Sequence, residues 1–204
     1  ERKKRAAVAA GNRQKSEAET RYLIDEQLRK VGWEADTEQL RYSKGTRPEK
    51  GRNMAIAEWP TDSQVGNKGY ADYALFVETK LVAIIEAKAI HKDIPSVIDY
   101  QCKEYPQNIR EVDSQYQIGT WGKYRVPFTF ATNGRPYLEQ YKTKSGIWFL
   151  DLRNSCNLPR ALRGWMSPDG IKALLVQDTE SKNQNLKQMP FDFLTDKEGL
   201  NLRP

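Results

Sequence analysis

An aspartate, a glutamate and a lysine in the middle of the chain are the residues best suited to carry chemistry. Asp72 lies in the apolar stretch GYADYALFV (69–77), and Glu86 and Lys88 lie in LVAIIEAKA (81–89). Side chains alternate across a strand, so Glu86 and Lys88 should share one face. If the two stretches pair as a hairpin, Asp72 comes beside Glu86, and two close carboxylates repel each other unless a cation lies between them. The pattern therefore predicts a divalent cation site.

Mg²⁺ suits such a site because it takes one or two carboxylates, keeps several waters and can bind a phosphate oxygen. Lys88 could orient or help deprotonate an attacking water, or stabilise charge on a phosphoryl group, while a metal lowers the pKa of the water. The predicted reaction is phosphodiester hydrolysis. The alternative is a solvated cluster of surface salt bridges, each worth about 0 to 1 kcal/mol.

Composition narrows the possible chemistries and partners. The single histidine, His91, excludes multi-histidine zinc or iron sites, and the two cysteines, Cys102 and Cys156, form no CxxC pair. A formal net charge of +6 and a pI near 9.2 favour a polyanionic partner. No apolar run approaches the roughly 20 residues that would span a bilayer, and the cysteine usage fits a reducing, cytoplasmic setting.

The elements that must position these residues alternate between helix and strand periodicity. We expect helices at 16–32, 94–109, 158–166 and 169–177, strands at 33–37, 69–77, 81–89, 126–132, 135–141 and 146–152, a long surface loop at 41–67 and a polar segment at 180–188. This order predicts an α/β fold in which helices flank a mixed central sheet. The expected domains are a flexible basic arm (1–15), a catalytic domain (16–178, with its core at about 16–150) and a linker (179–204).

The spacing of Asp72 and Glu86-Ala87-Lys88 resembles the PD-(D/E)XK nuclease signature, with Ala71 where the signature has proline. Gln101 and Tyr105 lie four residues apart and resemble the Q-x-x-x-Y element of RecB-like members. With the stretches SEAETRYLIDEQLRKVGWEAD and VPFTFATNG, the chain is similar to the N-terminal nuclease domain of type I restriction enzyme R (motor) subunits.

This resemblance implies a restriction-endonuclease-like fold and Mg²⁺-dependent cleavage of double-stranded DNA. It implies that Asp72 and Glu86 bind the metal. Glu19, or as a weaker candidate Glu17, would approach the metal. The residues of the Q-x-x-x-Y element would contact the DNA backbone or support the site. It also implies specificity (S) and methyltransferase (M) subunits as partners. The ending FDFLTDKEGLNLRP resembles the segment leading into an ATP-binding helicase motor, so ATP would serve that motor rather than this chain.

Other interpretations remain open at this level. The chain could be a RecB-like repair or recombination nuclease, or a catalytically silent DNA-binding or assembly module. Tyr105 could be a core residue, and Glu19 could be only the capping-box partner of Ser16. The basic residues of loop 41–52 could hold phosphates or form a solvated face.

Overall fold

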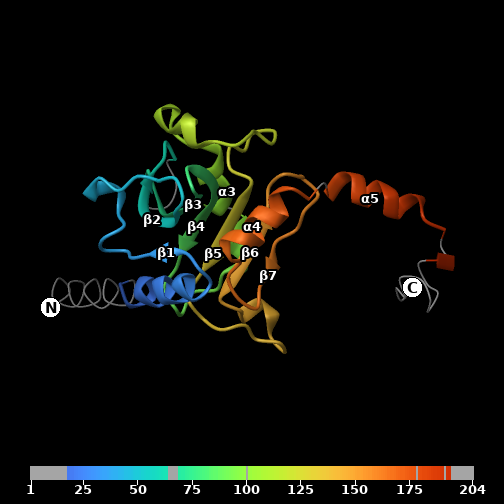
Figure 1. The fold of residues 1–204 in the computed structure, drawn as a ribbon. Helices are drawn as coiled ribbons and strands as arrows, with labels where there is room; N and C mark the ends of the chain where they lie inside the picture. The colour runs from blue at the N-terminus through green and yellow to red at the C-terminus, as the bar shows by residue number, and fades with distance from the viewer. Residues whose placement is uncertain (1–17, 64–68, 100, 178, 191, 194–204) are drawn as a thin grey trace. The chain divides into compact units, whose positions relative to one another are not determined.

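The computed structural model describes residues 18–63, 69–99, 101–177, 179–190 and 192–193. The chain divides into two compact units, Glu1–Ile171 and Lys172–Pro204. The first unit contains a seven-stranded sheet in which the strands lie in the order β1-β2-β3-β4-β5-β6-β7 (Figure 1). Neighbours in the sheet are therefore also neighbours in the sequence.

The sheet is mixed in strand direction. Its strands are β1 (Glu34–Ala35), β2 (Asn53–Pro60), β3 (Tyr70–Val77), β4 (Lys80–Ala87), β5 (Phe128–Thr132), β6 (Ile147–Asp151) and β7 (Arg160–Ala161). β1 with β2 and β4 with β5 pair in parallel, and the other pairs are antiparallel. Tyr73 pairs with Ile85 across the β3–β4 hairpin. Both the mixed sheet and the hairpin were predicted, and both are confirmed.

Helices pack on both faces of this sheet. The helices described before α5 are the N-terminal helix, described over 18–30, α2 (Pro95–Asp99), α3 (Gln101–Gln107) and α4 (Pro168–Leu175), with short 3-10 helices η1 (Tyr42–Lys44), η2 (Glu111–Tyr116) and η3 (Lys142–Lys144). Tyr105 of α3 packs in one core cluster with Ala74 and Ile84. Tyr73 instead bonds to Asp25 of the N-terminal helix. Since neighbouring side chains along a strand point to opposite faces, α3 and the N-terminal helix cover opposite faces.

The predicted surface loop at 41–67 is wrong in its central part, which forms β2. Glycine, proline and charge dominate the flanking sequence, but the residues from Met54 to Ala57 are fully buried between β1 and β3. Long-range pairing with β3 decides the structure of this segment, and local composition does not reveal such pairing.

Two further predictions are wrong after β5. Residues 135–141, expected as a strand, have irregular structure and lead into η3, and Tyr141 is 67% exposed. Residues 158–166, expected as a helix, contain β7, whose Arg160 pairs with Phe149 at the edge of the sheet. In that segment Leu158 is exposed and Trp165 is buried, so its apolar residues do not form one continuous helical face.

The second unit contains α5 (Thr179–Gln188), which covers the whole of the polar segment at 180–188, so the expectation of no regular structure there is wrong. The predicted basic arm (1–15) lies outside the described residues, and the linker role of 179–204 stays a prediction. Among the helices that the structure describes, none has both the length and the apolar character needed to cross a membrane.

Candidate active site

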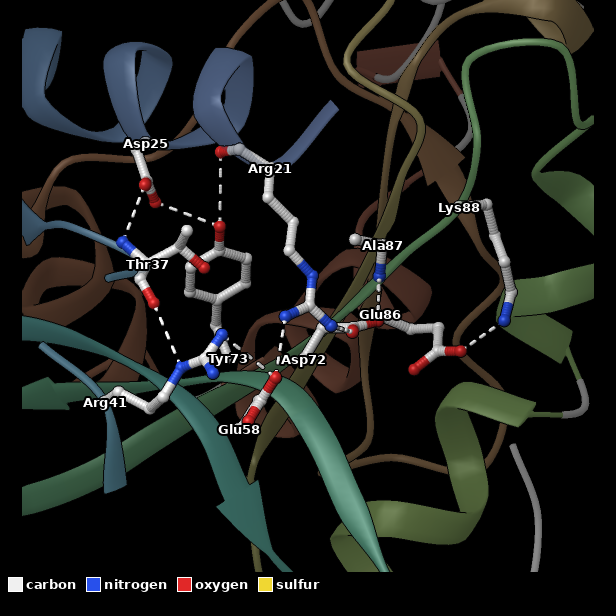
Figure 2. A network of polar contacts seen from close by, with 10 residues as sticks. All are labelled: Arg21, Asp25, Thr37, Arg41, Glu58, Asp72, Tyr73, Glu86, Ala87 and Lys88. Carbon is white, nitrogen blue, oxygen red and sulfur yellow. Dashed lines mark hydrogen bonds and ion pairs between the residues drawn. The ribbon is translucent and has the colours of Figure 1, made fainter. Parts of the chain in front are cut away.

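The β3–β4 hairpin brings Asp72 and Glu86 together because one lies near the start of its strand and the other near the end of the antiparallel partner. The Ala87 amide donates a hydrogen bond of 2.7 Å to Asp72 Oδ2, which ties the two strand ends together (Figure 2). The exposed fractions are only 3% for Asp72 and 1% for Glu86. Two carboxylates therefore share a nearly dry corner of the fold.

Lys88 completes this corner just beyond the end of β4. Its backbone amide donates to the Thr132 carbonyl at 2.7 Å, so the chain still follows β5 at this point. Its ammonium group contacts Glu86 Oε1, and its side chain stays 23% exposed. The lysine thus links the buried carboxylates to the surface.

The second carboxylate oxygen of Glu86, Oε2, is buried and has no hydrogen-bond donor in the described part of the chain. A buried acceptor without a donor is costly, and such atoms are rare in folded proteins. A cation between this oxygen and Asp72 would satisfy it, so the donor set fits Mg²⁺.

Burial also disfavours the charged form of Glu86 unless a positive charge lies nearby. Loss of solvation, followed by the nearby Asp72 carboxylate, raises the pKa of Glu86 to about 7, while Lys88 acts in the opposite sense. Ionisation of Glu86 near neutral pH thus depends on positive charge in its surroundings.

Arg21 and Glu58 also belong to this corner, and neither was predicted. Arg21 Nη2 lies 2.5 Å from Asp72 Oδ1, and Nη1 lies 3.1 Å from Glu58 Oε1. Glu58 stands in β2 between the register pairs Ala57–Tyr73 and Trp59–Ala71, at the level of Asp72. Its φ of 51° is unusual for a residue other than glycine.

A second network holds the N-terminal helix against β3 and so positions Arg21. Asp25 Oδ1 accepts a hydrogen bond of 2.9 Å from the Tyr73 hydroxyl, and Oδ2 accepts one of 2.7 Å from the Thr37 amide (Figure 2). Burial raises the pKa of Asp25, although both hydrogen bonds oppose the shift. Asp25 follows Arg21 by about one helical turn, so this anchor fixes where the guanidinium can reach.

The other predicted site residues are not seen at the carboxylates. Glu19 is exposed on the N-terminal helix, and it is Arg21 of that helix that contacts Asp72. Glu17 and the expected cap Ser16 lie outside the described residues. Tyr105 is fully buried in the core cluster.

Gln101 begins α3, but its side chain is outside the described part. Within the described ranges no three His, Cys, Asp or Glu residues form a metal cluster, so a cation here would take Asp72 and Glu86 and complete its shell with water.

Comparison with known proteins gives two matches. The family described as the second domain of the type I restriction enzyme EcoKI endonuclease subunit matches residues 34–175, which include Asp72, Glu86 and Lys88. The type I restriction enzyme EcoKI endonuclease subunit of Escherichia coli (strain K12) is 41% identical over 193 residues, which cover 83% of this chain and 16% of that protein. The chain thus spans a small part of this relative. No solved structure matches the chain.

Proposed function

Since the chain belongs to the family of the type I restriction enzyme EcoKI endonuclease subunit second domain, we propose that it is the nuclease domain of an R subunit and hydrolyses phosphodiester bonds of double-stranded DNA with Mg²⁺. It acts in the cytoplasm with specificity and methyltransferase subunits, which choose the target. ATP serves a motor domain elsewhere in the subunit, and the motor moves the DNA.

One observation carries this proposal: a buried glutamate oxygen without a donor lies beside a second buried carboxylate and a lysine at the open end of a hairpin. Asp72 and Glu86 would hold Mg²⁺ there. When bound, Mg²⁺ supplies a more acidic water and offsets negative charge on the phosphate.

The residues of the chain then have separate tasks. The Ala87 amide fixes the direction of the Asp72 carboxylate. The Lys88 ammonium, which donates to Glu86, would bind a phosphate oxygen or orient the attacking water. Tyr105 supports β4 by packing in the same core cluster as Ile84, and Gln101 would contact the DNA backbone or support the site, as the resemblance implies.

The test is plasmid cleavage by the whole R subunit with its partner subunits, ATP and Mg²⁺, while ATPase activity is recorded. We expect Glu86→Ala and Lys88→Ala each to lower the cleavage rate by about 100-fold or more, because each removes a group that acts in the transition state. ATPase activity should persist in both variants.

Lys80→Ala is the matched control, because Lys80 is an exposed lysine at the opposite end of the same strand. It should cleave as the wild type does. Undiminished cleavage in both site variants would exclude this site and leave the chain as a DNA-binding or assembly module.

A further inference from the structure

The charge of Asp72 is balanced by a guanidinium that comes from another layer of the fold. Arg21 Nη2 lies 2.5 Å from Asp72 Oδ1, and the two residues are 51 positions apart in the sequence. The Arg21 side chain is only 18% exposed, so its positive charge needs partners in the protein. The same carboxylate is one of the two that would hold a divalent cation under the proposed function.

Arg21 also has a second acceptor that lies outside the cation site. Its Nη1 contacts Glu58 Oε1 at 3.1 Å, and Arg41 Nη2 contacts the same oxygen at 3.1 Å (Figure 2). Glu58 is 32% exposed, far more than the 3% of Asp72. The guanidinium therefore bridges one buried carboxylate and one that is open to solvent.

The Arg21 side chain has space to move on the side that faces away from Asp72. Arg21 and Arg41 both line a groove of about 650 Å³ between the N-terminal helix and residues 36–41. A guanidinium that leaves Asp72 can therefore stay at Glu58 and turn toward this groove without unfolding the helix.

We propose that Arg21 is a counter-ion latch that occupies Asp72 in the cation-free protein and is retained by Glu58 when a divalent cation takes its place. This inference rests on the proposed function, because it assumes that Asp72 is a cation ligand. Arg21 and the cation compete for Asp72 Oδ1, so the latch lowers cation affinity by the free energy needed to release the guanidinium. Arg21 acts through Asp72 and is a positioning residue.

The experiment measures Mn²⁺ affinity of the full chain by isothermal titration calorimetry without DNA, which needs no catalytic turnover. Arg21→Met removes the competing charge, so its Mn²⁺ dissociation constant should fall by about tenfold relative to the wild type. Arg29→Met is the matched control: Arg29 lies on the same helix and lines the same groove, but it donates to the Ala35 carbonyl. Its Mn²⁺ affinity should equal that of the wild type.

A second variant, Glu58→Gln, should change Mn²⁺ affinity in the opposite direction to Arg21→Met, which distinguishes the proposal from a change in packing alone. Glu58→Gln takes away the charge that retains the released guanidinium, so Mn²⁺ should bind several-fold more weakly, and this loss should vanish when Arg21→Met is also present. Unchanged or weaker Mn²⁺ binding by a folded Arg21→Met variant would overturn the latch alone. If the wild type binds no Mn²⁺ that Asp72→Asn removes, both the latch and the proposed metal site are overturned.

Discussion

At the scale of the residue, the buried carboxyl of Glu86 makes the stability of the fold depend on pH. Burial, reinforced by Asp72, raises its pKa from 4.5 to about 7. Between these two values the unfolded chain releases the proton and the folded chain keeps it. The stability that Glu86 contributes is therefore complete below pH 4.5 and is lost as the pH rises to about 7.

Glu86→Gln removes this titration. Relative to the wild type in EDTA, the free energy of unfolding of the variant should rise by about 3 kcal/mol between about pH 4 and about pH 8. Urea denaturation at a series of pH values measures this difference. A difference that does not change with pH would mean that the folded-state pKa of Glu86 is near its ordinary value.

A buried hydroxyl on β3 helps to attach the N-terminal helix, alongside the ion pair between Arg21 and Asp72. The Tyr73 hydroxyl donates to Asp25 Oδ1 at 2.9 Å, and both residues are buried. Tyr73→Phe leaves that oxygen without this donor and should lower the free energy of unfolding by about 1–2 kcal/mol. Tyr22→Phe on the same helix is the control, because Tyr22 is 64% exposed. Equal stability of the two variants in urea denaturation would contradict this role of the hydroxyl.

At the scale of elements, the turn after β5 packs against the start of β6 through a glycine. A Cβ on Gly146 would lie 2.1 Å from the Arg135 carbonyl oxygen and 2.4 Å from its amide nitrogen. The Asn133 amide also donates to the Gly146 carbonyl at 3.1 Å. Because backbone atoms cannot move aside as the end of a side chain can, only glycine fits here.

Gly146→Ala should therefore lower the free energy of unfolding by about 2–4 kcal/mol. Gly164→Ala is the matched control, because nothing lies within 4 Å of the added Cβ and its φ is not in the left-handed region. That variant should change stability by less than about 0.5 kcal/mol. Thermal or urea denaturation of the pair isolates the cost of the backbone clash, and similar stabilities would argue against it.

The elements nearest the chemistry were the easiest to predict. The apolar runs of β3 and β4 are separated by a short polar turn, which is typical of a hairpin, and the strand period places Glu86 and Lys88 on one face. β2 was missed because Asn53–Pro60 follows a stretch rich in glycine, proline and charge, and its burial depends on a partner strand that the local pattern does not contain.

The same reasoning explains which site residues were missed. Arg21 meets Asp72 across 51 positions and Glu58 across 37, and no periodicity links such distant residues. Glu58 did give a weak signal, because it is the acid that interrupts the apolar run MAIAEWP. Assigning that run to a strand would have placed a third carboxylate near the hairpin.

At the scale of the whole molecule, the net charge of +6 does not show which of the 33 lysines and arginines are open to a DNA phosphate, because some of them have partners within the fold. In loop 41–52, Arg52 pairs with Glu34 at 2.5 Å, and the Arg47 guanidinium stacks 3.6 Å from the centre of the Tyr42 ring. Lys44 and Lys50 of that loop are exposed. Arg47 and Arg52 thus stabilise the fold, and we expect phosphate contacts of this loop to come mainly from its exposed lysines.

DNA affinity and DNA cleavage should therefore respond differently to the same substitution. Affinity for a duplex depends on many phosphate contacts spread over the surface, and it should fall at least about tenfold between about 50 and about 200 mM salt. Cleavage depends on a few groups at the buried carboxylates Asp72 and Glu86.

Glu86→Gln removes one buried negative charge and no surface cation. The slope of log DNA affinity against log salt concentration should therefore match that of the wild type, as measured by fluorescence anisotropy with Ca²⁺ in place of Mg²⁺. Cleavage with Mg²⁺ should be lost. A changed slope would mean that the carboxylate corner itself sets how the duplex is held, which would join binding and chemistry in one site.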